Sequence, residues 1–85
     1  MKAHKLKTHI EYYQKVVSGE KDWELRLNDR NFEIGDQLIL EEYDNDKKEY
    51  TGFSTSRIVT YILNDAEHFG LMNRYCIMSF LRPDR

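Results

Sequence analysis

The sequence predicts a small α+β domain, mainly β, in which one or two helices flank a closed or half-closed barrel of five to six short strands. The length of 85 residues suits a single domain, residues 1–85. Residues 8–18 have the apolar spacing of a helix, and the remaining apolar runs are short and separated by turn residues, as in small barrels. Closing the sheet also removes exposed edge strands.

The helix is predicted from its start signal, its apolar stripe and its end. Thr8 and Glu11 have the spacing of a capping box, in which each side chain bonds the backbone N–H of the other residue. The apolar side chains that follow recur at helical spacing, at Ile10, Tyr13, Val16 and Val17. Gly19 suits the left-handed conformation that commonly ends a helix.

The strands are predicted from alternation, apolar content and flanking turns. The segments are residues 4–7, with Leu6 pointing inward, 21–27, 37–43, 50–53, 56–63 and 75–81. A charged hairpin loop is expected at 44–49, and 64–73 is expected to be a loop with a helical turn around His68. Apolar residues occur on both faces of segment 56–63, which indicates burial on both sides over part of its length.

Segment 21–27 contains the most informative pattern in the chain. Its apolar side chains, Trp23, Leu25 and Leu27, share one face by strict alternation, and we expect that face to pack on the core. Glu24 and Arg26 are two residues apart and therefore share the opposite face. The simplest interpretation of that polar face is a solvated surface, since exposed ion pairs contribute only about 0–1 kcal/mol to stability.

A second interpretation is that the polar face lines a cleft between the helix and the barrel. Further polar residues extend it from the strand end, the neighbouring strand and the end of the helix: Asn28, Arg30, His4, Lys7 and Lys21. Tyr12 cannot share a helix face with Tyr13, which belongs to the apolar stripe, so Tyr12 can border the cleft. Lys21 also has a purely structural explanation, because a cation is favoured near a helix C-terminus.

The residues around this strand resemble those of a known superfamily. The G-x-K-x-x-E-x-R motif of the ASCH superfamily, named for a transcriptional coactivator, is similar to Gly19-x-Lys21-x-x-Glu24-x-Arg26. The chain also resembles small bacterial and phage ASCH-like proteins, and this similarity covers about residue 4 to about residue 81. The flanking elements that carry it are His4-x-Leu6-Lys7-Thr8, Asn28-Asp29-Arg30, Phe32-x-x-Gly35-Asp36, Glu42-Tyr43 and Tyr50-Thr51-Gly52.

The resemblance implies a PUA-like β pseudo-barrel with the N-terminal helix beside it. It also implies a cleft that binds RNA or a nucleotide-like ligand, lined by Lys21, Glu24 and Arg26, with Gly19 holding the turn. Arg26 can hydrogen-bond a phosphate or a base edge in a bidentate manner, and Lys21 acts as a mobile point charge. Glu24 can accept from an exocyclic amine or a ribose hydroxyl, or it can orient Arg26. Trp23, expected in the core, would stack on a base if it instead topped the cleft.

Two other functions are alternatives to a binding module. Some small ASCH proteins are amidohydrolases acting on acylated cytidines, which makes Lys21 and Glu24 candidate catalytic residues by resemblance. Those enzymes place a threonine where this chain has Glu24, and no hydroxyl lies between Lys21 and Arg26, which counts against hydrolysis. A buried lysine–glutamate pair can still act as general acid and base. The remaining alternative is a protein-interaction domain whose motif serves only the fold.

Composition argues against several classes of protein. A net charge of −2 disfavours nonspecific binding to nucleic acid through its phosphates, which usually requires a basic protein. The three histidines and the single Cys76 lack the spacing of a zinc site, so no metal and no cofactor is predicted. Cys76 lies in an apolar run and is expected in the core. The absence of a signal peptide and of a membrane-spanning stretch predicts a cytoplasmic protein, with the oligomeric state left open.

Overall fold

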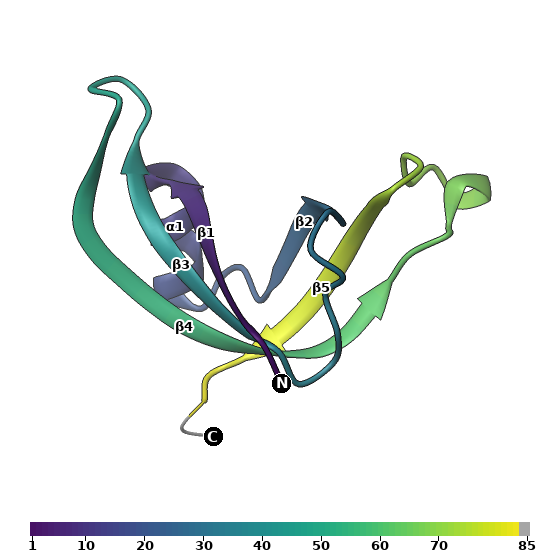
Figure 1. Cartoon of the computed structure of the whole chain (residues 1–85). Coiled ribbons are helices and arrows are strands. Elements are labelled where there is room, and N and C mark those ends of the chain that lie inside the picture. Colours follow the sequence, from purple (N-terminus) through teal and green to yellow (C-terminus); the bar gives the residue numbers. More distant parts are fainter. Residues whose placement is uncertain (84–85) are drawn as a thin grey trace.

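The computed structural model describes residues 1–83, and in that range it has one five-stranded sheet and one α-helix (Figure 1). The elements in chain order are β1 (Ala3–His9), α1 (Ile10–Ser18), β2 (Trp23–Leu27), β3 (Gln37–Asp44), β4 (Glu49–Leu63), the 3-10 turn η1 (Glu67–Phe69) and β5 (Tyr75–Leu81). A mainly β fold with one helix is confirmed, as is the helical turn around His68. The segments predicted separately at 50–53 and 56–63 form one continuous strand.

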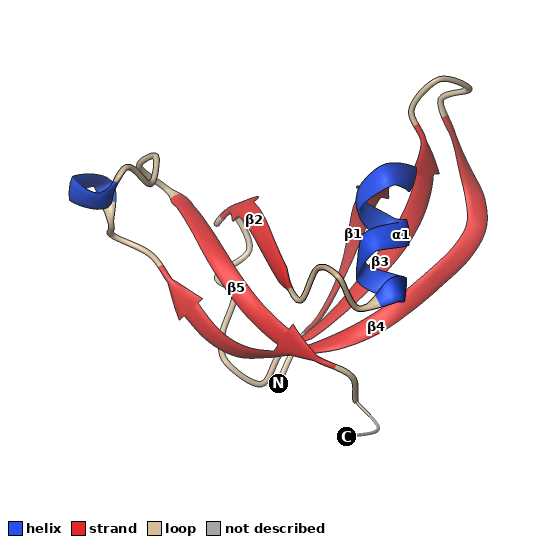
Figure 2. Ribbon diagram, turned by 180° about the vertical axis from the view of Figure 1, so that it is seen from behind, coloured by secondary structure: helices blue, strands red, loops and turns tan. Residues whose placement is uncertain are grey.

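β4 shapes the sheet because it belongs to both of its arms. The strand order is β1-β3-β4-β5-β2, with β1 and β3 parallel and the other pairs antiparallel. β4 pairs with β3 as far as Ile58 and with β5 from Ile58 onward, and its register shifts between Val59 and Tyr61. Such a bulge bends a strand, and the sheet folds into a trough with two arms (Figures 1 and 2).

The trough does not close into a barrel. β1 and β2 are the two edge strands of the sheet, and each is hydrogen-bonded to one neighbour, β3 and β5 respectively. They face each other across the open side of the trough (Figure 1). The closed form of the predicted barrel is therefore not formed, because side chains rather than a backbone ladder connect these two edges.

Helix α1 packs on the arm made by β1 and β3. Its buried residues are Tyr13 and Val16, whereas Ile10 and Val17 are exposed, so the apolar stripe is narrower than predicted. The reason is that only one arm of the sheet lies against the helix. Gly19 ends the helix with a φ of 86°, which confirms the predicted left-handed position. No helix within residues 1–83 is long and apolar enough to cross a membrane.

The predicted capping box at the start of the helix is not formed. Thr8 belongs to β1, where its buried Oγ1 donates to the carbonyl oxygen of Leu6, 3.2 Å away. The helix begins one residue after His9, which occupies the N-cap position and makes no side-chain capping hydrogen bond. The prediction was wrong because β1 continues directly into α1, and the pairing of Thr8 with Glu42 of β3 holds it in the sheet.

Two buried polar residues of the sheet fasten α1 in place. Glu42 accepts hydrogen bonds from Gln14 Nε2 (2.8 Å) and from Thr51 Oγ1 (2.7 Å). Arg57 donates from Nη2 to the carbonyl oxygen of Val16 (3.3 Å), near the end of the helix, where a cation is favoured. The helix is thereby held at one face by β3 and at its C-terminal end by β4.

The hydrophobic core lies inside the trough. Its members are Leu6, Tyr13, Val16, Phe32, Leu38, Leu40, Val59, Cys76, Met78 and Phe80. Leu6 and Cys76 are buried as predicted, and burial raises the pKa of the Cys76 thiol. The prediction that segment 56–63 is buried on both faces over part of its length is wrong, since the fully buried residues share one face. Only Arg57 and Val59 of β4 are fully buried, because no second layer formed by residues 1–83 covers the outer side of that strand.

β2 has the opposite orientation to the one predicted. Trp23, Leu25 and Leu27 are 45%, 50% and 37% exposed, whereas Glu24 is only 3% exposed. The cause is the register with β5, which pairs Glu24 with the core residue Met78. Paired residues of antiparallel strands project from the same face, so the polar face of β2 turns into the trough and its apolar face turns outward.

The fluorescence of Trp23 provides a direct test of this orientation, because it is the single tryptophan of the chain. We expect native protein at submicromolar concentration to emit at long wavelength and to be quenched readily by acrylamide, since the indole is exposed. Lys21→Ala, which removes the cation above the ring, should leave the quenching high. A blue-shifted emission that acrylamide does not reach would place Trp23 in the core and contradict the observed register.

Candidate functional site

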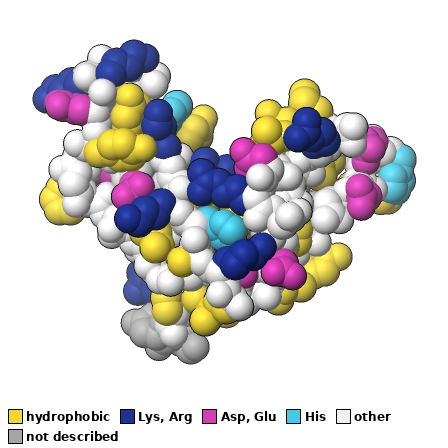
Figure 3. All heavy atoms as spheres, in the orientation of Figure 1, with side chains coloured by type: hydrophobic (Ala, Val, Ile, Leu, Met, Phe, Trp, Pro, Cys, Tyr) yellow, Lys and Arg dark blue, Asp and Glu magenta, His cyan; other side chains and the backbone are white. Residues whose placement is uncertain are grey.

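A cleft of about 380 Å³ lies between the two edge strands and the start of α1. It is lined by Lys7, Thr8, His9, Tyr12, Lys21, Trp23, Glu24, Leu25 and Arg26. The volume falls within the range of about 300–1,000 Å³ that is common for small-molecule sites. Figure 3 shows a notch between the two arms, with Lys and Arg side chains gathered at its base. The open seam of the sheet is therefore hollow enough to hold a ligand.

Glu24 is the centre of the charged cluster in this cleft. Lys21 Nζ lies 2.6 Å from Glu24 Oε1, and Arg26 Nε donates to Glu24 Oε2 at 2.7 Å. The side chain of Glu24 is 4% exposed, that of Lys21 12% and that of Arg26 25%. The two basic residues are close to Glu24 because Lys21 precedes β2 and Arg26 follows Glu24 on the same face of the strand. A buried carboxylate thus fixes two cations side by side.

Arg26 also connects the two edges of the sheet. Its Nη2 donates to the carbonyl oxygen of Lys7 (2.9 Å) and to Thr8 Oγ1 (3.3 Å), both on β1. Arg30, in the loop after β2, donates from Nη1 to the carbonyl oxygen of Lys5, at 2.9 Å. Lys5 and Lys7 are two residues apart, so their carbonyl groups point from the same edge of β1. Two guanidinium groups therefore occupy the seam that a backbone ladder would close in a complete barrel.

Lys21 is held in the cleft by a backbone oxygen and an aromatic ring in addition to Glu24. Its Nζ donates to the carbonyl oxygen of Trp23 at 2.6 Å and lies 4.6 Å from the centroid of the Trp23 ring. A cation above an indole is stabilised by the ring quadrupole. Trp23 consequently borders the cleft, which is the alternative position considered for it from the sequence.

The outer rim of the cleft is made of aromatic and basic side chains. Lys7 Nζ lies 4.2 Å from the centroid of the Tyr43 ring. The His9 ring is 6.4 Å from both Tyr12 and Tyr43. Tyr12 borders the cleft as predicted, whereas Thr8 and His9 were not identified as cleft residues. Their assignment to the start of the helix concealed them, and the alternation of Lys5 and Lys7 with Leu6 was the available strand signal.

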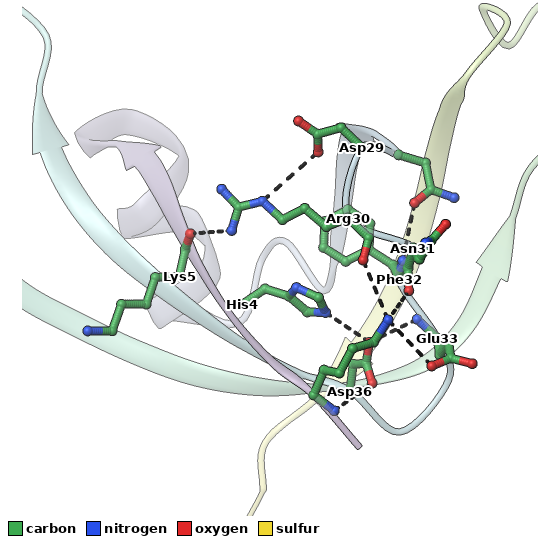
Figure 4. A network of polar contacts seen from close by, with 10 residues as sticks. His4, Lys5, Asp29, Arg30, Asn31, Phe32, Glu33 and Asp36 are labelled. Atoms are coloured by element: carbon green, nitrogen blue, oxygen red, sulfur yellow. Dashed lines mark hydrogen bonds and ion pairs between the residues drawn. The ribbon is translucent and has the colours of Figure 1, made fainter.

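Three residues that the sequence placed in the site lie outside the cleft and make structural contacts. Arg30 is bonded to β1 as described above, and Asn28 Oδ1 accepts from the backbone N–H of Phe32 at 3.2 Å. His4 is buried, with its ring 4.7 Å from that of Phe32 in an edge-on arrangement (Figure 4). None of the three lines the cleft. Together they hold the loop between β2 and β3 against β1.

Asp36 accepts the hydrogen bonds at the contact between β1 and the loop that joins β2 to β3. His4 Nε2 lies 2.9 Å from Asp36 Oδ2, which also accepts from the backbone N–H of Glu33 (Figure 4). Asp36 Oδ1 accepts from the backbone N–H of Lys2 at 3.0 Å. Burial by itself raises the pKa of this carboxyl, but the hydrogen bonds from His4, Lys2 and Glu33 outweigh burial and lower the pKa to about 2.

The geometry of the side chains also bears on two other functions, hydrolysis and metal binding. Thr8 provides a hydroxyl in the cleft, but its oxygen is bonded to Leu6 and Arg26 rather than to Lys21. The motif strand therefore does not pair a lysine with a hydroxyl in the way expected of the amidohydrolase alternative. Within residues 1–83 no group of three or more His, Cys, Asp and Glu side chains is placed to hold a metal ion.

The fold and the site together define a small α+β domain with a polar cleft between two sheet edges. The chain belongs to the family described as domain of unknown function DUF3850, whose model matches residues 3–80. It is also similar to the uncharacterized 12.9 kDa protein in the GpA 3′ region of Escherichia phage P2, with 48% identity over 42 residues. That match covers 49% of this chain and spans only 38% of the length of the phage protein.

Proposed function

We propose that the cleft binds a nucleotide or a short single-stranded segment of RNA. The observation that carries the proposal is the buried carboxylate of Glu24, which holds Lys21 and Arg26 side by side in a ligand-sized cleft. Fixing two cations before the ligand arrives reduces the entropy lost on binding. The ASCH-like motif supports the same ligand class by resemblance.

The charge balance of the cleft suits an anionic ligand. Lys7, Lys21 and Arg26 provide three positive charges and Glu24 one negative charge, so the lining carries +2 with His9 neutral. The whole chain carries −2. A local positive field within an acidic protein attracts a phosphate to one place rather than along the whole surface. This agrees with recognition of one nucleotide and disfavours nonspecific coating of RNA.

The hydrogen-bonding capacity left in the cluster also suits a phosphate or a base edge. Arg26 uses Nε and Nη2 for Glu24, Lys7 and Thr8, and among the described residues its Nη1 has no hydrogen-bond partner. Tyr12 and Trp23 border the cleft, and both rings are about half exposed. Aromatic rings at such a position stack on bases with little regard to sequence. The ligand would therefore meet a donor at its charged end and a ring at its base.

Titration of 15N-labelled protein with nucleoside monophosphates and short RNAs tests this function. We expect saturable shifts of the amide signals of Lys7, Tyr12, Lys21 and Trp23. Lys7→Ala should weaken binding roughly 3- to 10-fold by removing one charge contact, and Tyr12→Ala roughly 5- to 100-fold by removing a stacking platform. Raising the salt concentration should weaken binding with a slope that reflects few phosphate contacts.

Two matched controls distinguish the cleft from the general surface. Lys5→Ala removes an exposed lysine from the same strand as Lys7 but outside the cleft. Tyr50→Ala removes a tyrosine that is 53% exposed, compared with 51% for Tyr12. Both should bind like the wild type. Equal losses in the control and cleft variants, or no saturable shift at millimolar ligand, would rule out the proposed function.

A further inference from the structure

We propose that the outer face of the β4–β5–β2 arm is the interface of a homodimer. The term outer face denotes the residues of these strands that point away from the trough: Trp23, Leu25, Leu27, Ile58, Tyr61, Leu63, Tyr75, Ile77, Ser79 and Leu81. Helix α1 packs on β1, on β3 and on the part of β4 that pairs with β3, where Arg57 bonds Val16, so it does not cover this face (Figure 2). Trp23 and Leu25 belong both to this face and to the lining of the cleft, but the dimer requires no bound ligand.

The register of the sheet makes the outer face continuous. Leu25 of β2 pairs with Ile77 of β5, and Ile77 pairs with Leu63 of β4, so these three side chains form one apolar row across the strands. Neighbouring pairs extend the row in both directions along the strands, with Trp23 opposite Ser79 and Leu27 opposite Tyr75. Residues paired in this way project from the same face. The face is thus a surface of three strands rather than a set of scattered side chains.

The composition of the outer face is unlike that of the rest of the chain. Charged residues make up 33% of the sequence, yet none of the residues of the outer face is charged. Six of its large apolar side chains are between 37% and 60% exposed: Trp23, Leu25, Leu27, Tyr61, Leu63 and Leu81. Its polar atoms include the Ser79 hydroxyl, which is bonded to the Thr60 hydroxyl at 2.8 Å.

The apolar area of this face is large for a monomer and close to the area that a dimer requires. With roughly 150 to 250 Å² for each complete side chain, these six leave on the order of 400 to 700 Å² in contact with solvent. The largest apolar patch on a typical monomer is about 300–600 Å². A standard interface buries about 800 Å² on each partner, so the exposed apolar side chains alone supply most of that area.

A second copy of the chain is the occupant that this chemistry favours. The face has no charge with which to select a partner of opposite charge, and an apolar face is complementary to itself. Homodimer interfaces are more apolar than interfaces between transient partners, and two-fold dimers are the commonest oligomers. Two sheets of this kind pack face to face about 10 Å apart, with their strands nearly aligned. The proposed dimer would form a sandwich from the two β4–β5–β2 arms.

Sedimentation velocity of the full chain, from roughly 1 µM to roughly 300 µM, tests the dimer by mass action. We expect the weight-average mass to rise from 10.3 kDa toward twice that value. Leu25→Glu and Tyr61→Glu each place a charge in the face and should remain monomeric over the whole range. Phe53→Glu is the control, because Phe53 is 70% exposed on the same strand as Tyr61 but in the other arm. It should dimerise like the wild type.

Circular dichroism establishes whether each variant is folded. If a glutamate variant is unfolded, Tyr61→Ser is used in its place. The emission of Trp23 offers a second measurement, since it should move to shorter wavelength as the wild type dimerises. A wild type that stays monomeric at the highest concentration would overturn the proposal, even if the face then captured a different protein. A dimer that persists unchanged in Leu25→Glu and Tyr61→Glu would place the interface elsewhere and would overturn it equally.

Discussion

Replacing Glu24 by alanine is expected to lower the free energy of unfolding by about 3 kcal/mol. The substitution leaves Lys21 and Arg26 next to each other without the carboxylate that both contact, at 2.6 Å and 2.7 Å. Removing one partner of a buried ion pair is more costly than the pair is favourable, because the remaining charge is poorly solvated. Urea unfolding followed by circular dichroism measures the change.

An exposed glutamate provides the control for this prediction. Glu20 forms an ion pair with Lys15 at 3.2 Å, with both side chains more than half exposed. Glu20→Ala should leave the urea midpoint almost unchanged, since surface pairs contribute little. If Glu24→Ala behaves like Glu20→Ala, the cluster does not have the buried, mutually dependent geometry described here.

A triple variant separates the role of the cluster in stability from its role in binding. Replacing a complete buried ion cluster by apolar residues of similar volume is often neutral or stabilising. We therefore expect Lys21→Met, Glu24→Leu and Arg26→Met together to be more stable than Glu24→Ala alone, and to lose ligand binding. Such a result would show that the stability of the fold does not require the charges and that they serve the cleft.

Replacing Asp36 by asparagine is expected to lower the free energy of unfolding by about 2 kcal/mol near neutral pH. The pKa of the Asp36 carboxyl is about 2 in the folded chain, compared with 3.8 ordinarily. Because the folded value is the lower one, ionised Asp36 stabilises the fold fully above about pH 4 to 5. That stabilisation is lost progressively as the pH falls through about 2.

The pH dependence of stability tests whether Asp36 causes the loss of stability in acid. Wild-type stability should decrease between about pH 4 and about pH 2, whereas Asp36→Asn should show a smaller decrease from a lower starting value. Asp46→Asn, in the exposed hairpin loop, is the matched control and should retain the wild-type profile. A profile for Asp36→Asn that runs parallel to that of the wild type at all pH values would contradict the assignment.

Much of the fold follows from short-range patterns. The helix ends at Gly19 because the left-handed conformation is a property of that residue and its neighbours. The hairpin between β3 and β4 and the 3-10 turn near His68 likewise lie where local turn residues predict them. The proximity of Glu24 and Arg26 was also predictable, since residues two apart on a strand share a face whichever way that face points.

Contacts between residues far apart in the sequence determined which way the polar face of β2 points. Alternation in β2 defines two faces, but the pairing of Glu24 with Met78 determines which one meets the core. The usual rule that apolar residues point inward failed because the outer side of this arm has no covering layer in the structure. Thr8 was misplaced for a related reason, since its pairing with Glu42 keeps it in a strand despite a good local capping signal.

The sequence by itself determined most of the elements, the end of the helix and the identity of the charged cluster, because each depends on residues within a few positions of one another. Only the tertiary structure decided that the sheet stays open, that Arg26 and Arg30 fill its seam, and that His4 serves Asp36 rather than the cleft. These outcomes depend on strand order and register, which are set by the combined burial of side chains from the whole chain.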